Sequence, residues 1–218
     1  MSAVAAPPTR LPSRLQPLLD RVRGHEWVEA ARIVAPAAED ATRAVDFLVV
    51  PSTAGVQMLR RSGKLQLLAV WRDLMPPGIS SRVRWHLVED LAHPRSADDV
   101  LHSRPIVDAV ERDGADAVSC RLRVPYEMRV FDGHFVGVPL VPGMLQGAWA
   151  LDIARDALPQ AGGFVGIDAV KFRRLVRPGM ALRLTLRWRV DTSELRFDYV
   201  DGPTTISLGR LRMAGGRG

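Results

Sequence analysis

The chain has 218 residues, of which 47% are hydrophobic and 25% are charged, and its formal net charge is +6. This length allows one large domain or two small ones with real cores, and the composition is typical of a globular chain rather than a disordered one. No apolar run approaches the roughly 18 residues of a membrane helix, and the Ala/Pro-rich start lacks the apolar core of a signal peptide. A single cysteine, Cys120, excludes an intrachain disulfide and a zinc cluster. We therefore expect a cytoplasmic protein with no membrane span.

The positive charge is carried mostly by arginine. Such a charge balance favours binding to nucleic acid, to a membrane surface or to an acidic protein, or it reflects an arginine-rich proteome. The sequence leaves these interpretations open. The predicted function below needs no nucleic acid. We also expect no metal and no cofactor, because four histidines lack a metal-ligand spacing: His25, His86, His93 and His102.

The first half mixes helical and extended patterns in the order αββαβ. After an extended or disordered start over residues 1–12, Ser13 is placed to cap a helix with one apolar face, and β-like runs follow at 30–35 and 44–50. A helix over 53–71 with a break near Gly63 ends before Pro76-Pro77-Gly78, and residues 82–88 alternate as a strand. We predict a small α+β domain over residues 13–102.

Residues 103–218 predict a second domain. Two β-like runs flank the turn pair Asp113-Gly114, and Cys120 lies in the apolar phase of the second run. A helix starting at Pro142 is apolar over 144–154 except for Gln146 and Asp152, which predicts a buried helix. Alternating runs over 182–190, 195–199 and 206–213 predict long antiparallel strands, with a bulge at Gly209. The pattern indicates an α+β fold with an antiparallel sheet wrapped around a central helix.

Two motifs connect this second half to a known family. One is Gly133-His134-Phe135, followed by Gly137, Pro139 and Val141-Pro142-Gly143-Met144-Leu145. The other is Gly166-Ile167-Asp168-Ala-Val-Lys171-Phe172-Arg173-Arg174-Leu-Val-Arg-Pro178-Gly179. In this order they resemble the 3-hydroxyacyl-(acyl-carrier-protein) dehydratases, over about residues 104–213. The resemblance implies the hotdog fold and a 3-hydroxyacyl thioester on a carrier protein or coenzyme A.

A variant of the first motif narrows the resemblance. The run Gln146-Gly-Ala-Trp149-Ala150, with Val124-Pro125 upstream, is similar to the branch found with aryl-polyene pigment gene sets and fused to acyl-activating ligases. The implied pathway is fatty-acid, polyketide or aryl-polyene pigment biosynthesis.

Dehydration removes a proton from C2 of the substrate and expels the C3 hydroxyl. Histidine is the side chain suited to such proton transfer near neutral pH, so His134 is the predicted base. Gly143 at the helix start offers a free amide to polarise the thioester carbonyl, and its lack of a side chain permits close approach. The residues expected to bind substrate are Phe135, Val141, Met144, Ala148 and Trp149, although Trp149 also fits a packing role.

In the resembled family, a Glu or Asp on this helix protonates the leaving hydroxyl, working across a dimer from the histidine. That position falls on Ala148. Three readings stay open: Asp152, one turn later on the same face, takes the role; water or His134 alone serves; or the chain is a non-catalytic subunit. Asp152 also fits a plain surface carboxylate.

The resemblance also implies partners. Four basic residues correspond to positions that bind an acidic carrier, although a solvated strand face is the alternative: Lys171, Arg173, Arg174 and Arg177. A hotdog sheet leaves an edge strand that pairs across a two-fold axis, so we expect a homodimer or a heterodimer with another hotdog protein. A hotdog thioesterase is a further alternative function.

Residues 14–101 resemble the C-terminal lid subdomain of acyl-activating adenylate-forming enzymes, through the runs 25–34, 44–50 and 81–90. In that family a lysine after the last strand contacts the acyl-adenylate, whereas the corresponding place falls near Asp98. The reversed charge predicts no ATP chemistry and leaves a docking or stabilising module.

Overall fold

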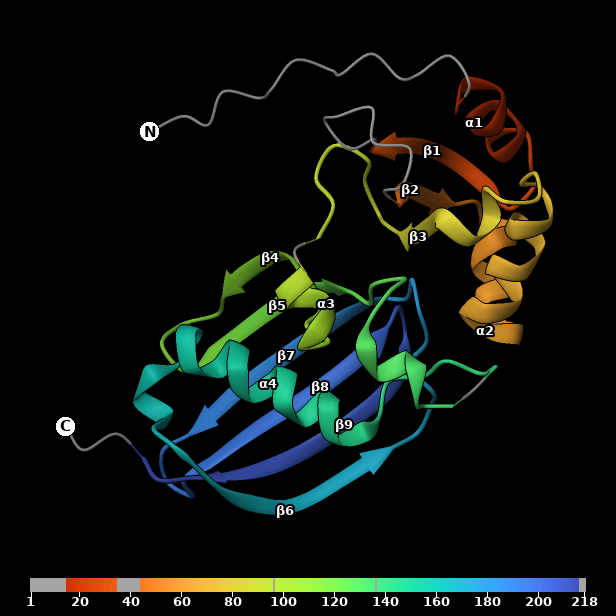
Figure 1. The fold of residues 1–218 in the computed structure, drawn as a ribbon. Helices are drawn as coiled ribbons and strands as arrows, with labels where there is room; N and C mark the ends of the chain where they lie inside the picture. The colour runs from red at the N-terminus through yellow and green to blue at the C-terminus, as the bar shows by residue number, and fades with distance from the viewer. Residues whose placement is uncertain (1–14, 35–43, 96, 136, 216–218) are drawn as a thin grey trace, which may run out of the picture. The chain divides into compact units, whose positions relative to one another are not determined.

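The computed structural model describes residues 15–34, 44–95, 97–135 and 137–215, and it divides the chain into units of residues 1–95 and 96–218 (Figure 1). The sequence predicts this boundary at residue 102. The short helix α3 (Ala97–Leu101) falls in the second unit instead. The segment after it is tied to that unit, because the Trp149 indole donates to the Ser103 carbonyl (2.9 Å) and the Val130 amide donates to the Ser103 hydroxyl (3.1 Å).

The first unit has the predicted order αββαβ. It contains α1 (Gln16–Arg23), β1 (Val28–Val34), β2 (Val45–Pro51), α2 (Thr53–Asp73), the 3₁₀ turn η2 (Ser80–Arg82) and β3 (Val83–Leu87). The three strands form one sheet in the order β1-β2-β3, in which β2 pairs antiparallel with β1 and parallel with β3. The parallel pair follows from α2, since a helical connection returns the chain to the start of the sheet.

Local sequence explains the helices of this unit. The apolar face of α1 is buried through Leu18, Leu19 and Val22, whereas the expected cap Ser13 lies outside the described residues. The Ser52 hydroxyl accepts a hydrogen bond from the Gly55 amide and caps α2. The predicted break at Gly63 is confirmed, because that residue has φ 78° and ψ 170° inside α2.

The second unit is the predicted antiparallel sheet around one helix (Figure 1). Its strands are β4 (Ile106–Arg112), β5 (Ala117–Arg123), β6 (Phe164–Phe172), β7 (Ala181–Arg189), β8 (Glu194–Asp201) and β9 (Thr204–Met213). They form a six-stranded sheet in the order β4-β5-β7-β8-β9-β6 with every neighbour antiparallel. The helix α4 (Gly143–Ala157) packs on one face, with the 3₁₀ turns η3 (Arg129–Asp132) and η4 (Pro159–Ala161) before and after it.

Strict alternation builds this sheet. In β7 the leucines at 182, 184 and 186 are buried under α4, while Arg183, Arg187 and Arg189, which alternate with the buried positions, face outward. Cys120 lies in the same core, as predicted, and burial raises the pKa of its thiol to about 11. The inward faces of β5, β7 and β8 meet Trp149, Ala150 and Ala154 of α4 in one apolar core.

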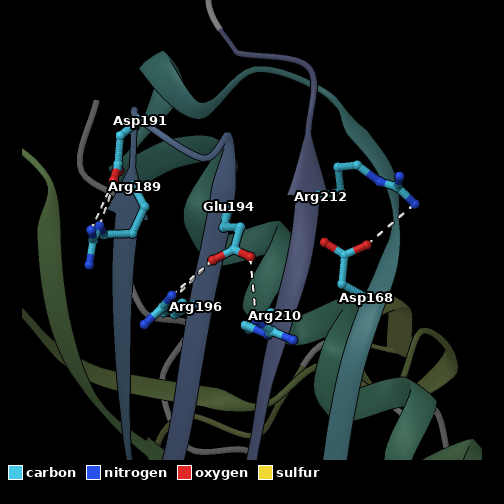
Figure 2. A network of polar contacts seen from close by, with 7 residues as sticks. All are labelled: Asp168, Arg189, Asp191, Glu194, Arg196, Arg210 and Arg212. Atoms are coloured by element: carbon cyan, nitrogen blue, oxygen red, sulfur yellow. Dashed lines mark hydrogen bonds and ion pairs between the residues drawn. The ribbon is translucent and has the colours of Figure 1, made fainter.

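The outward face of the sheet holds most of the unit's arginines. Figure 2 shows Glu194 between Arg196 (3.0 Å) and Arg210 (3.6 Å). In the same view, Asp191 pairs with Arg189 (3.0 Å) and Asp168 with Arg212 (3.3 Å). These arginines therefore lie on a solvated strand face, where acidic residues pair with them.

Three details differ from the sequence analysis. The bulge in β9 lies at Ile206 rather than Gly209, because Tyr199 pairs with Ser207 while Val200 pairs with Thr205. Gly209 faces inward instead, where an added Cβ would meet the Phe197 ring at 2.5 Å. The central helix begins at Gly143, one residue later than predicted, because Pro142 has an extended ψ of 144°.

Candidate active site at the N-terminus of the central helix

A tight loop after η3 carries the predicted base. The His134 amide donates to the Val130 carbonyl (3.0 Å), and the His134 carbonyl accepts from the Leu140 amide (2.9 Å). These two bonds fix the backbone on both sides of the residue while its imidazole stays exposed, 5.1 Å from the Phe135 ring. The loop thus fixes the backbone of a residue whose imidazole is accessible to solvent.

The second predicted group is the start of α4. Pro142 precedes the helix, no side chain caps it, and the Leu145 and Gln146 amides turn back to the Pro142 carbonyl. Among the described residues, the amides of Gly143 and Met144 donate to no acceptor. Uncapped amides at a helix N-terminus attract a negatively polarised oxygen.

The fold brings the two sequence motifs together at this point. The Val141 amide donates to the Val176 carbonyl (2.8 Å), which joins the first motif to the second. The ring of Phe172, at the end of β6, lies where a Cβ on Gly143 would be. Only glycine fits at the helix start while this ring stays in place. A glycine at position 143 is therefore needed for steric reasons as well as for access to its amide.

One face of α4 is open in the single chain. Met144, which is 70% exposed, Ala148 and Asp152 follow one another at four-residue steps along it. The expectation of a helix buried on most sides is therefore wrong for this face. Asp152 Oδ1 accepts a hydrogen bond from Arg155 (2.7 Å), and Ala148 places no carboxylate on the face.

Two other predicted binding residues lie inside the unit. Trp149 is 2% exposed, and its indole nitrogen is engaged by the Ser103 carbonyl, so it has no donor left for a ligand. Val141 is buried beside Val176. These positions support the packing reading of Trp149.

The basic segment follows Phe172 directly. The Arg173 and Arg174 amides both donate to the Ile206 carbonyl at the β9 bulge (2.8 and 3.2 Å). Lys171, Arg173 and Arg174 expose their side chains, and Arg177 is partly buried. The bulge therefore anchors a basic segment next to the ring that touches Gly143.

A buried polar cluster behind α4 escaped the sequence analysis as a site. The Ser207 hydroxyl donates to Gln146 Oε1 (2.6 Å), and the Tyr199 hydroxyl donates to the Gln146 carbonyl (2.9 Å). Burial raises the pKa of the Tyr199 phenol well above its usual value, with a smaller effect from Cys120. The available signal was Gln146 itself, a polar residue in an apolar helix.

The remaining histidines are placed in ordinary polar contacts. His86 bonds to Asp46 (2.8 Å) and His93 to Asp90 (3.0 Å) on the first unit. Within the described ranges, no group of three or more His, Cys, Asp or Glu side chains gathers as a metal site. No helix in those ranges is long and apolar enough to cross a membrane.

Comparison with known proteins adds the family. A 3-hydroxyacyl-[acyl-carrier-protein] dehydratase FabZ of Clostridium perfringens is 31% identical over 118 residues, which are 50% of this chain and 82% of that protein. The chain belongs to the 3-hydroxyacyl-[acyl-carrier-protein] dehydratase family. The family model described as ApeI-like, ApeI dehydratase, also matches residues 110–210, which include both motifs.

Further relatives of this dehydratase family match over shorter parts of their length. The FabZ of Chloroflexus aggregans is 42% identical over 97 residues, with 41% of this chain and 61% of that protein covered, and for the FabZ of Ligilactobacillus salivarius the chain covers 62%. A solved structure titled the dehydratase heterocomplex ApeI:P, from Xenorhabdus doucetiae, is 29% identical with a TM-score of 0.48. That match covers 50% of this chain and 97% of the other.

Proposed function

We propose that this chain acts in the dehydration of 3-hydroxyacyl thioesters carried by an acyl carrier protein. The observation that carries this proposal is the meeting of the two family motifs at the uncapped start of α4, through the Val141–Val176 bridge and the Phe172 ring on Gly143. This arrangement offers a site for a thioester carbonyl close to an exposed basic segment.

In the proposed mechanism the thioester carbonyl accepts hydrogen bonds from the amides at the helix start. Negative charge that develops on this oxygen as C2 loses its proton is stabilised there, and such a donor is typically worth roughly 3–4 kcal/mol. The His134 imidazole takes the C2 proton, and the C3 hydroxyl departs as water. The base contributes about 10²- to 10⁴-fold in rate.

The departing hydroxyl needs a proton, and the exposed positions of α4 that follow Ala148 include two carboxylates, Asp152 and Asp156. Asp152 lies one turn beyond Ala148, but its pairing with Arg155 shows that this carboxylate has a cation of its own. We therefore keep two versions of the proposal. In the first, Asp152, water or His134 itself delivers the proton. In the second, the chain is the non-catalytic subunit of a heterodimer.

A second hotdog chain fits a free edge of the sheet, whose two edge strands are β4 and β6. Strand β6 pairs with β9 on one side, and its apolar residues are exposed: Phe164 (49%), Val165 (57%) and Ile167 (43%). An exposed apolar edge strand is a pairing surface. We propose that a homodimer or a heterodimer forms there and covers the open face of α4, which presents Met144 at the same end as Phe172.

The basic segment supports carrier binding. Lys171, Arg173 and Arg174 expose cationic side chains directly beside Phe172, where the thioester would enter. An acidic carrier docked there would deliver its acyl group to the start of α4. Coenzyme A thioesters, which present phosphates, are the alternative substrate form.

For the first unit we propose a docking or stabilising module without ATP chemistry. Its three-stranded α+β fold agrees with the resemblance to the lid subdomain of adenylate-forming enzymes. We propose the pathway to be fatty-acid, polyketide or aryl-polyene pigment biosynthesis.

The test is a turnover assay with a 3-hydroxyacyl carrier protein, read by mass for the loss of one water. We expect dehydration by the wild type and a fall of about 10²- to 10⁴-fold in His134→Ala. The matched control is His93→Ala, which removes an exposed histidine of the first unit. Turnover restored only by a second hotdog protein would select the subunit version. Release of the free acid would select a thioesterase, and unchanged turnover in His134→Ala would refute the assigned base.

A further inference from the structure

Ser103 is a buried serine in the connection between α3 and β4, outside both sequence motifs. It is 6% exposed, and its φ angle of 52° lies in the left-handed region, which is unfavourable for a residue with a Cβ. In the part of the chain that the structure describes, Ser193 (φ 51°) is the other non-glycine residue with a positive φ. Such a backbone persists where surrounding contacts hold it in place, and it often marks a functional site.

The hydroxyl of Ser103 holds the turn that precedes the predicted base. The Val130 amide, in η3, donates to this hydroxyl at 3.1 Å. The Val130 carbonyl in turn accepts from the His134 amide at 3.0 Å and from the Gly133 amide at 3.4 Å. Two consecutive hydrogen bonds therefore connect the Ser103 side chain to the backbone of His134.

The carbonyl of Ser103 holds the central helix. The Trp149 indole donates to this carbonyl at 2.9 Å, and Trp149 is 2% exposed. Gly143 precedes Trp149 by six residues, which is about 9 Å along the helix axis. Because a helix moves as a rigid element, the contact at Trp149 also fixes the amides at the start of α4. The Ser103 amide donates to the Val100 carbonyl at 3.2 Å, so the amide, the carbonyl and the hydroxyl of Ser103 are all engaged.

One residue thus supports both halves of the candidate site. The segment with His134 is held at its far end by the Leu140 amide, which donates to the His134 carbonyl at 2.9 Å, and at its near end through Ser103. The helix start is held through Trp149. The separation between an imidazole and a bound carbonyl matters for the rate, because a displacement of about 1 Å can cost about 100-fold.

We propose that Ser103 is a positioning residue that sets the place of the His134 imidazole relative to the amides at the start of α4. It acts through Val130 on one side and through Trp149 on the other. This role rests on the proposed function, since it affects the rate only where His134 is the base.

The test is Ser103→Gly, which removes the hydroxyl but keeps the carbonyl that accepts from Trp149 and tolerates the left-handed backbone. The matched control is Ser193→Gly, which makes the same change at the other serine with a positive φ, between β7 and β8. In Ser103→Gly we expect kcat for dehydration to fall by about 10- to 100-fold with little change in KM, because the base is displaced while binding at the helix start is kept. Ser193→Gly should change neither constant.

Two further readouts separate positioning from a general loss of structure. In the His134→Ala background, Ser103→Gly should cause no further loss of kcat, because the two residues act as a unit. Hydrogen exchange followed by NMR needs no activity. The amides of Val130 and His134 should exchange about tenfold faster in Ser103→Gly than in the wild type, while the amides of β7 keep their protection.

Unchanged kcat in Ser103→Gly, or an equal fall in both glycine variants, overturns the positioning role and leaves the proposed function standing. A fall in kcat that persists in the His134→Ala background, or that occurs without faster exchange at Val130 and His134, also overturns it. Absence of dehydration by the wild type, alone and with a second hotdog protein, overturns the proposed function and the positioning role together.

Discussion

Replacing Gly143 with alanine tests the contact that joins the two motifs. The new Cβ would overlap the Phe172 ring, so the ring has to leave its position. The ring is 51% exposed, which leaves about 100 Å² of a roughly 200 Å² side chain buried. At about 25 cal/mol per Å², full loss of that burial costs about 2.5 kcal/mol. The helix propensity of alanine offsets up to about 1 kcal/mol, so the net loss is about 1.5–2.5 kcal/mol.

The measurement is urea unfolding of the wild type and Gly143→Ala, with dehydration turnover on the same preparations. Gly147→Ala is the matched control in the same helix, because a Cβ at Gly147 meets no atom within 4 Å. We expect that control to be at least as stable as the wild type. Phe172→Ala should absorb most of the effect of Gly143→Ala, since the obstructing ring is gone. Equal stability of Gly143→Ala and Gly147→Ala would refute the assigned contact.

Three further predictions follow from burial and charge. Leu184→Ala, at a fully buried position of β7, should lower the free energy of unfolding by about 3–5 kcal/mol. Leu65→Ala, at a 67% exposed position, should change the free energy of unfolding by less than about 0.5 kcal/mol. Equal losses of stability in urea titrations would contradict the assigned core. Cys120 should resist iodoacetamide at pH 8 in the native protein and react after unfolding, because burial raises its thiol pKa to about 11. Rapid alkylation of the native protein, followed by mass spectrometry, would contradict the buried position of Cys120. Burial raises the pKa of Asp46, but hydrogen bonds from Arg84 and His86 outweigh burial and hold this pKa below the ordinary 3.8. The carboxylate therefore stabilises the first unit above pH 3.8, and this contribution disappears as the pH falls through the lowered pKa. Acid unfolding titrations should show a weaker pH dependence of stability in Asp46→Asn than in the wild type, and identical curves would exclude the contribution.

The helices and strands were predictable where the hydrophobic periodicity and the positions of glycine and proline agree. The alternation of apolar and polar residues over 182–188 is the period-two pattern of a strand with one buried face. The helix break at Gly63 and the turn at Gly114 were predictable from residue type, and both glycines have positive φ angles. These features are local, so the sequence contains all the information that they need.

The bulge at Ile206 and the open face of α4 were not predictable in the same way. Gly209 carried the local signal for a bulge, but the register is set by β8 and β6 on either side, which place the shift at Ile206. The helix reads as apolar around most of its surface. Which face stays open depends on where a single sheet ends, and that is a property of the packed unit.

By itself, the amino-acid sequence determined the second unit's fold class and the two motifs, and it led to the predictions that His134 and Gly143 act in the site and that Ala148 stands where the family has its carboxylate. These conclusions rest on periodicity and residue identity, which are written in the chain. Only the tertiary structure decided that Phe172 covers Gly143, that Trp149 is a packing residue, and that the Ser207 hydroxyl donates to the Gln146 side chain. Each of these is a contact between residues far apart in sequence, fixed by strand register and helix docking rather than by local propensity.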